Sequence, residues 1–281
     1  THNVSSAASD VYKRQTHALR PLHLDLRGQM ACILVCCIPL LFGFVIPVGV
    51  LLKFVLTGGL VGNVLAIAEV LGGSVLVAGM AALLITLVST FIVLAATYRG
   101  GAALRRMAMV ASTGYAVPGT MLAIGVLIFA GSVDRSFAAV TGDGRASLLL
   151  GGVGILILAY LVRFQAVGYG AVLSGIRRLP DNMMGASRVL GNGFTSSLRR
   201  VILPLLSGSM VAGGLLVFVD VMKELPMTLL LRPFDFETLA TYTYQFAKDE
   251  MLEEAALPAL MIVIAGLLPV ILMNRMLRRT D

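Results

Sequence analysis

Six long apolar runs, separated by shorter polar intervals, dominate the 281-residue chain. Each run is close to the roughly 20 residues that an α-helix needs to cross a ~30 Å hydrocarbon layer. The pattern therefore predicts an all-α integral membrane protein with six transmembrane helices. The runs are Met30–Leu52, Val70–Thr97, Met107–Gly131, Ser147–Val167, Leu205–Met222 and Ala255–Met273.

Composition agrees with a membrane location, because 58% of the residues are hydrophobic and only 13% are charged. The net charge of +7 would suit a nucleic-acid-binding protein, but the basic residues are scattered between apolar runs. Membrane topology requires such scattering. We therefore expect a lipid environment and no nucleic-acid partner. Cys32, Cys36 and Cys37 share the first run and give no disulfide framework; a metal bound by Cys32 and Cys36 is an alternative, although no histidine or carboxylate accompanies them.

A basic interval of about residues 177–204 separates the fourth and fifth runs. It carries five arginines and one acid, so it cannot lie in lipid, and we expect it in the cytosol. Pro180–Asp181 predicts a helix start, and this helix should end near Leu190. Gly191 enters left-handed conformations cheaply and predicts a turn into a second short helix. Pro204 stands where the fifth membrane helix is expected to begin.

The spacing within this interval resembles the EAA loop of ABC-importer permeases. In that loop Glu-Ala-Ala is followed by three residues and a Gly, then by nine residues and an aliphatic residue, and then by one residue and Leu-Pro. The corresponding residues are Gly185, Ala186, Ser187, Gly191, Val201, Leu203 and Pro204. The resemblance implies a loop that docks into a cleft on a separate ATPase subunit. Gly185 stands where the family has Glu, so one polar contact of that docking is missing. An ordinary basic loop is the alternative reading.

The lysines and arginines of the loops predict the orientation. One side carries 11 of them and the other 6, and the richer side is cytosolic in membrane proteins. This places the basic interval and both chain ends in the cytosol. Residues 220–254 hold eight acids and three bases and face outward. Such an acidic face would suit a cationic substrate, because carboxylates raise the local cation concentration.

Two polar interruptions are candidates for a transport path and gate. Pro118, in the third run, removes a backbone donor and predicts a kink or break; interrupted helices often line transport paths, and a harmless proline kink is the alternative. Asp220, Lys223 and Glu224 lie within about one helical turn, just ahead of Pro226. Charges at such a depth usually face water or a partner, which predicts an outer gate. An ion pair that ends the helix at the membrane surface is the alternative.

Longer stretches extend the resemblance to the C-terminal half of ferric-iron ABC permeases. They include VFVDVMKELPMTLLLRPFDFETLATYTYQFAKDE, the EAALPALMIVIAGLLPVIL that follows it, GYAVPGT and AYLVRF, so that the resemblance covers about Pro21 to Arg279. It implies a permease subunit in the bacterial inner membrane, with a periplasmic binding protein outside and a dimer of ABC ATPase subunits in the cytosol. Ferric iron is the implied substrate. Related permeases serve thiamine, polyamine and phosphonate importers, which are the alternatives.

The chain has no G-x-x-x-x-G-K-[ST] phosphate-binding loop. We therefore expect ATP on the partner subunit and no cofactor on this one. No HExxH or GxSxG motif occurs and no histidine lies in a run, which argues against a membrane-embedded enzyme. A secondary transporter would need a proton or sodium relay near the bilayer midplane, and Asp220 is the only acid within the six runs.

The N-terminal residues 1–15 read THNVSSAASDVYKRQ and resemble translated sequencing adapter. We expect them to be non-native, with residues 16–29 a cytosolic lead-in or linker and residues 30–281 the transmembrane permease domain. Permeases of this type usually have two six-helix halves. This chain is then the second half of a fused permease, or one copy of a homodimer, and either arrangement supplies a second docking loop.

Overall fold

The computed structural model describes residues 25–58, 64–111, 113–142, 149–180 and 182–277. Across these ranges every regular element is helical and no residue is in a β-strand. Within the described ranges, six helical stretches are long and apolar enough to cross a membrane, which confirms the all-α class and the predicted number of spans. Residues 1–15 and most of the predicted lead-in lie outside the described ranges. The six stretches are Leu26–Thr57, Leu65–Tyr98, Gly119–Thr141, Val153–Ile176, Phe194–Met222 and Leu252–Leu272.

The chain divides into two compact units, residues 1–49 and residues 50–281. The described part of the first unit is helix α2 (Leu26–Leu40), a π-turn η1 (Leu41–Val45) and the start of α3 (Ile46–Thr57). The Asp25 carboxylate caps α2 by accepting a 3.0 Å hydrogen bond from the backbone N–H of Gly28. None of the three elements contains a buried residue, as expected of an apolar helix whose surroundings are lipid or a partner.

Two π-turns carry helices through prolines. The turn η1 and its counterpart η3 (Leu198–Ile202) each end two residues before a proline, Pro47 and Pro204 respectively. Proline cannot donate the usual hydrogen bond to the carbonyl four residues back. In both places the N–H that follows the π-turn instead bonds to the carbonyl five residues back, and the helix continues. Helix α10 (Leu203–Met222) begins beside Pro204 as predicted, but it continues the helical stretch that starts at Phe194.

The third predicted run, Met107–Gly131, is not one helix. Helix α5 (Ala102–Ala111) is followed by a 3₁₀ turn η2 (Gly114–Ala116) and then by α6 (Gly119–Thr141). Pro118 is the N-cap residue of α6, with ψ 135°, a backbone value that no α-helix contains. The predicted break at Pro118 is confirmed, and it is a complete interruption. The membrane span consequently starts at Gly119.

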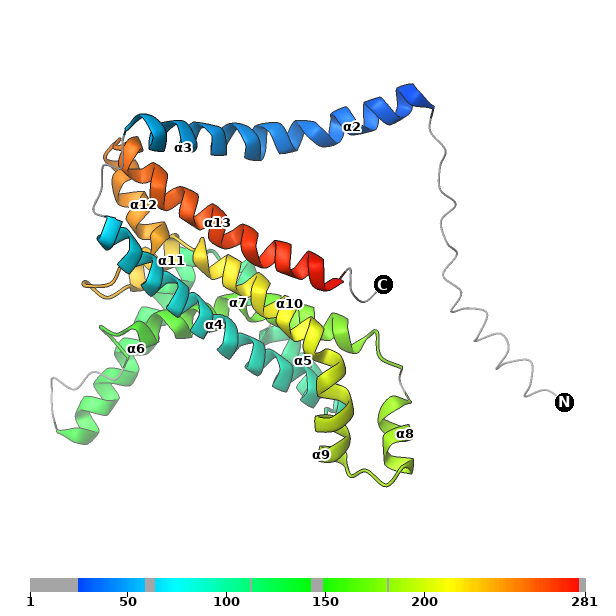
Figure 1. Ribbon diagram of the computed structural model, residues 1–281. Helices are drawn as coiled ribbons and strands as arrows, with labels where there is room; N and C mark the ends of the chain where they lie inside the picture. The colour runs from blue at the N-terminus through cyan, green and yellow to red at the C-terminus, as the bar shows by residue number, and fades with distance from the viewer. Residues whose placement is uncertain (1–24, 59–63, 112, 143–148, 181, 278–281) are drawn as a thin grey trace. The chain divides into compact units, whose positions relative to one another are not determined.

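The second unit is built around α4 (Val64–Tyr98), α7 (Val153–Ile176) and α10 (Leu203–Met222), which pack against one another (Figure 1). Small residues allow their close approach. A Cβ placed on Gly175 of α7 would lie only 2.6 Å from the Cβ of Ser209 on α10. Interfaces of this kind are common between membrane helices, because small side chains let two backbones approach closely.

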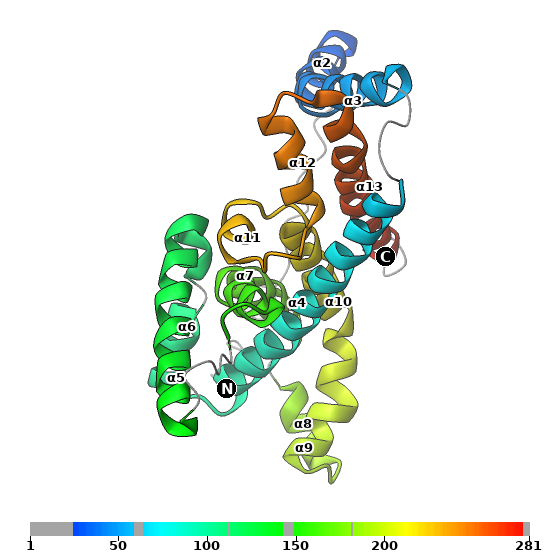
Figure 2. The ribbon, with the colours of Figure 1, turned by 90° about the vertical axis from the view of Figure 1, so that its left-hand side faces the viewer.

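Shorter helices lie at the two ends of α10 (Figures 1 and 2). At one end are α8 (Met183–Val189) and α9 (Phe194–Ser197). At the other end, α11 (Pro226–Leu231) and α12 (Leu239–Lys248) lead into the last span, α13 (Leu252–Leu277). The two predicted sites therefore lie at opposite ends of one helix.

Candidate functional site

The predicted helix–turn–helix of the basic interval is formed by α8 and α9 and is called the hairpin below. Helix α8 begins after Asn182, whereas Asp181, which was expected to start it, lies outside the described residues. Helix α9 passes through η3 into α10 without a break, so that Phe194–Met222 forms one span. The second arm of the hairpin is thus continuous with a core helix of the bundle.

A left-handed glycine makes the turn of the hairpin. Gly191 has φ +86°, and its N–H donates to the carbonyl of Arg188 at 2.9 Å. The next N–H, of Asn192, donates to the carbonyl of Ser187 at 3.2 Å. These bonds satisfy carbonyls that the end of α8 leaves without helical partners. The predicted role of Gly191 in the turn is confirmed, whereas Gly193 has φ −67° and does not need to be glycine.

Two buried serines join the arms of the hairpin. The hydroxyl of Ser187 donates to the hydroxyl of Ser197 at 2.9 Å, and both residues are buried. Ser187 is the residue that departs from the family pattern at the third position. Its partner was not found from the sequence, because two serines ten residues apart carry no local signal of pairing.

The inner face of the hairpin is packed against the bundle. Met183 and Met184 of α8, together with Leu203, contact a buried cluster that joins α4, α7 and α10. A displacement of α8 must therefore disturb this cluster or move the helices that form it. The cluster consists of Val93, Leu94, Val172, Ile176, Ile202 and Leu206.

The outer face of the hairpin is exposed and mixes apolar with basic groups. Val189 and Leu190 are 88% and 82% exposed. The guanidinium of Arg188 lies 5.7 Å from the centre of the Phe194 ring, and that of Arg99 on α4 lies 4.8 Å from the same ring. The remaining predicted docking residues differ in exposure. Three are exposed (Gly185, Ala186 and Pro204), and two are half-buried (Val201 and Leu203).

The predicted gate residues Asp220, Lys223 and Glu224 do not form one cluster. The Asp220 carboxylate and the Lys223 ammonium pair at 2.9 Å, and the Lys223 side chain is 60% exposed. The hydrogen bond to Asp220 raises the pKa of Lys223, so the Lys223 ammonium stays charged at neutral pH. A pair with such exposure contributes little to stability.

Glu224 is buried and pairs with a different cation, Arg163 of α7. The Arg163 Nε and Glu224 Oε2 atoms lie 3.5 Å apart, and the two side chains are 17% and 9% exposed. Arg163 was not identified as a site residue from the sequence. An arginine near the middle of an apolar run is nevertheless a signal, because charge inside a membrane span is costly and usually functional.

The Arg163 guanidinium also holds the interrupted segment before α6. Its Nη1 donates to the carbonyl of Val117 at 2.9 Å, and the group lies 5.8 Å from the ring centres of Tyr115 and Phe164. The approach is so close that a Cβ on Gly119 would lie 3.0 Å from Glu224 Oε1 and 3.1 Å from Arg163 Nη1. The structure thus brings the Pro118 break and Glu224 together, with Arg163 between them.

The hydroxyl groups of Tyr160 and Thr228 connect α7 and Glu224 to helix α11 through hydrogen bonds. Tyr160, one turn before Arg163 on α7, makes a 2.6 Å hydrogen bond with the Thr228 hydroxyl, and Thr228 donates to the carbonyl of Glu224 at 2.7 Å. Glu224 Oε1 accepts from the N–H of Met227 at 3.2 Å. Pro226 is the first residue of α11, where a missing N–H costs nothing.

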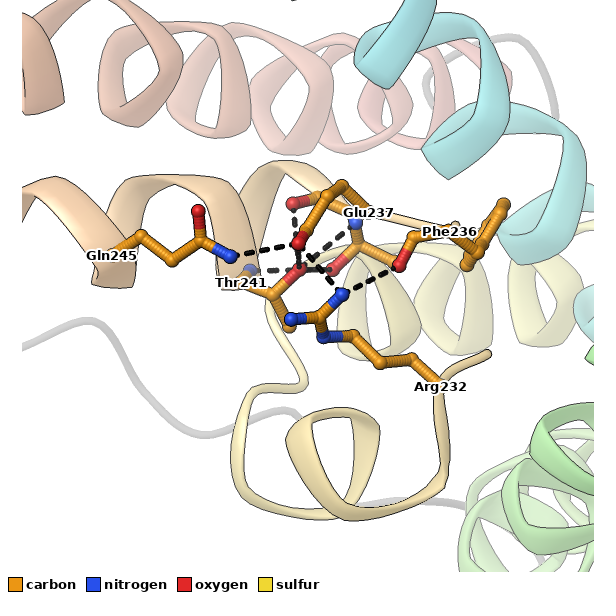
Figure 3. A network of polar contacts seen from close by, with 6 residues as sticks. Arg232, Phe236, Glu237, Thr241 and Gln245 are labelled. Atoms are coloured by element: carbon orange, nitrogen blue, oxygen red, sulfur yellow. Dashed lines mark hydrogen bonds and ion pairs between the residues drawn. The ribbon is translucent and has the colours of Figure 1, made fainter. Parts of the chain in front are cut away.

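A second polar network fixes the loop between α11 and α12 (Figure 3). Arg232 Nη1 lies 2.6 Å from Glu237 Oε1 and donates to the carbonyl of Phe236 at 3.0 Å. Glu237 also accepts hydrogen bonds from Thr241 at 2.6 Å and from Gln245 at 2.7 Å. Glu237 is one of the eight acids of residues 220–254, and its carboxylate holds this loop.

An apolar cavity of about 760 Å³ lies beside the interrupted segment. Gly114 and Val117 of the segment line it, together with residues of α4, α5, α6 and α7. Gln165 closes one side; its Nε2 donates to Ser89 at 3.0 Å, and its Oε1 has no partner among the residues that the structure describes. The segment therefore has free volume on one side and the Arg163 contact on another.

Comparisons with known proteins agree with the resemblance seen in the sequence. No protein-family model matches the chain. It is 28% identical, over 121 residues, to the Fe(3+)-transport system permease protein FbpB 2 of Haemophilus influenzae. The match covers 43% of this chain and 24% of that protein, so the chain matches about a quarter of the length of this curated relative.

Solved structures show the same fold. A chain of the bacterial alginate ABC transporter, in complex with a periplasmic protein that carries an alginate pentasaccharide, has a TM-score of 0.66 at 13% identity, over 90% of this chain and 94% of that one. A chain of the inward-facing MetNI methionine ABC transporter has a TM-score of 0.53 at 17% identity, over 78% and 95%. Sequence similarity and fold together support a multi-pass membrane protein that resembles ABC importer permeases.

Proposed function

We propose that this chain is the transmembrane permease subunit of an ATP-driven ABC importer. The observation that carries the proposal is the hairpin. One end of the core bundle bears a tightly turned, internally bonded pair of helices, packed on its inner face and exposed on its outer face. The fold that the chain shares with ABC transporter chains supports the proposal, in which the hairpin is the element that binds an ATPase subunit.

In this proposal the hairpin transmits motion and performs no chemistry. ATP binds to a dimer of separate cytosolic subunits, whose closure shifts the hairpin as a rigid body. The packing of Met183 and Met184 on the core cluster then passes the shift to α7 and α10. The chain needs no cofactor of its own for this role.

Ferric iron, delivered by a periplasmic binding protein, is the proposed substrate. The similarity to a Fe(3+)-transport permease supports it, and so do exposed acids beyond the α11–α12 loop, Asp249, Glu250 and Glu253. Thiamine, polyamine and phosphonate remain alternative substrates of the same permease type. A secondary transporter that works without an ATPase is the alternative mechanism.

The proposed assembly contains a second permease half, because two ATPase subunits need two hairpins. That half is either fused to this one or a second copy of it. The assembly lies in the bacterial inner membrane with the hairpin and both termini in the cytosol. Alkaline phosphatase, which is active only in the periplasm, should be silent when fused after Asp281 and active when inserted in the 232–238 loop; the reverse result would overturn the orientation.

Uptake by a reconstituted system tests the function. Vesicles that carry the complete permease, its ATPase and its binding protein should accumulate radiolabelled ferric iron only with ATP. Excess thiamine, spermidine or methylphosphonate should not compete. Competition by one of these compounds would reassign the substrate, and ATP-independent uptake would favour a secondary transporter.

A further inference from the structure

The helical path is interrupted at two places, at the ends of membrane spans, and each interruption leaves a backbone group without a helical partner. The first interruption is residues 113–118, between α5 and α6, and the second is residues 223–225, between α10 and α11. The two interruptions flank the spans Gly119–Thr141 and Phe194–Met222, and a backbone group that lies away from water without a hydrogen-bond partner costs several kcal/mol. Both interruptions therefore require side chains that complete their hydrogen bonding.

One ion pair supplies both missing partners. The Arg163 guanidinium donates to the carbonyl of Val117 in the first interruption. The Glu224 carboxylate accepts from the N–H of Met227, which follows the second interruption. Because Arg163 and Glu224 also contact each other at 3.5 Å, the two interruptions are closed by a single pair of opposite charges.

We propose that Arg163 and Glu224 form a latch that holds the interrupted segment 113–118 against the corner between α10 and α11, and that transport requires its release. The latch rests on the geometry described above, and its role in transport rests on the proposed function. Both halves of the latch belong to this chain, because the Arg163 guanidinium binds the Glu224 carboxylate.

The choice of residues fits a latch better than a purely structural contact. A buried ion pair is often no more stabilising than apolar side chains of the same size, because desolvation offsets the attraction. Apolar packing, however, would not order two orphan backbone groups. The two charges either contact each other, which closes the latch, or lie apart, which opens it. The adjacent cavity of about 760 Å³ gives the segment 113–118 space to move when the latch is open.

Ala116 offers a probe of the segment, since it is exposed and small. A nitroxide spin label on Ala116→Cys reports the mobility of the segment after Cys32, Cys36 and Cys37, all exposed, have been replaced by serine. The key variant is the double substitution Arg163→Met with Glu224→Gln. It avoids a lone buried charge, and the amide oxygen of glutamine still accepts from Met227.

The matched control is Arg135→Met. Arg135 is also on a membrane helix, but it is exposed and bonds only to Ser132 of its own helix among the contacts that the structure gives for it. We expect the mobile fraction of the label to rise about tenfold in the double variant, within the range typical of coupled sites, and to stay within about twofold in the control.

The second measurement is the number of ATP molecules hydrolysed for each substrate ion imported by the complete transporter. A latch predicts a rise of about fivefold or more in the double variant, because ATP hydrolysis continues while the gate no longer closes. A merely structural contact would lower the amount of folded protein and leave this ratio unchanged.

The outcomes separate the two proposals. Equal label mobility in the double variant and the parent would overturn the latch, whatever the transporter carries. Higher mobility with an unchanged ATP-to-substrate ratio would overturn its role in transport. If the parent shows no ATP-driven uptake, the proposed function fails, while the mobility measurement still decides whether the latch exists.

Discussion

The turn of the hairpin allows a matched test of the link between backbone conformation and ATPase binding. Gly191 has φ +86° and Gly193 has φ −67°, and a Cβ added at either would meet nothing within 4 Å. An alanine at Gly191 therefore costs only backbone energy, about 1–2 kcal/mol for a left-handed L-residue. An alanine at Gly193, the N-cap residue of α9, is instead expected to change the stability little, because the gain from a more restricted unfolded chain is offset by the poorer N-cap preference of alanine.

The two variants should thus differ by about 1–2 kcal/mol in the free energy of forming the turn, a factor of roughly 5 to 30 in its population. Hydrogen exchange of the Asn192 amide, which bonds to Ser187, measures this population directly. Exchange should accelerate in Gly191→Ala and be unchanged or slower in Gly193→Ala. The same order should appear in affinity for the partner ATPase, with equal amounts of both variants in the membrane.

Equal exchange rates for the two variants would refute the reasoning about the turn. Faster exchange in Gly191→Ala with unaltered ATPase affinity would show that the turn is formed as described but does not shape the docking surface. The comparison needs no assumption about the substrate.

Three further predictions concern single positions. Gly114→Ala would place a Cβ against a backbone carbonyl oxygen of α7, so we expect the free energy of unfolding to fall by about 1–3 kcal/mol. Size-exclusion chromatography after heating should show aggregation at a lower temperature. The control Gly125→Ala, with open space around the added Cβ, should not change this temperature. Glu250 has φ 61°, and Glu250→Gly should raise the stability in the same assay by about 1 kcal/mol. Ser187→Ala leaves the buried Ser197 hydroxyl without its partner, which should destabilise the hairpin by about 1–3 kcal/mol and speed hydrogen exchange there. The double variant Ser187→Ala with Ser197→Ala should destabilise the hairpin less, because it leaves no hydroxyl unpaired.

Features that depend on local backbone chemistry could be predicted from the sequence. Hydrophobic length gave the six spans, the left-handed preference of glycine gave the turn at Gly191, and the missing donor of Pro118 gave the break before α6. The sequence did not predict that the helix continues upstream of Pro204, where a π-turn compensates for the missing donor. A helix with a proline can end, bend or adopt a π-turn, and the local sequence does not distinguish these outcomes.

Features that depend on contacts between distant segments could not be predicted. Lys223 stands next to Glu224 in the chain, which suggested that the two charges act together. The structure instead pairs Lys223 with Asp220 and Glu224 with Arg163, 61 positions earlier. The partner of a buried charge is decided by helix packing, and packing here depends on which glycines face a neighbouring helix.

The hairpin and the latch are joined by the same two helices. Helix α10 runs continuously from α9 of the hairpin to Met222, two residues before Glu224, and α7 runs from the neighbourhood of Arg163 to Ile176 in the cluster beneath the hairpin. The helices are in close contact along their length, since a Cβ on Gly213 of α10 would lie 2.8 Å from that of Ala171. Interfaces packed so closely slide only in discrete steps. A shift of the hairpin that moves α10 along α7 therefore has to change the distance between Glu224 and Arg163, which is the distance that the latch requires to be short.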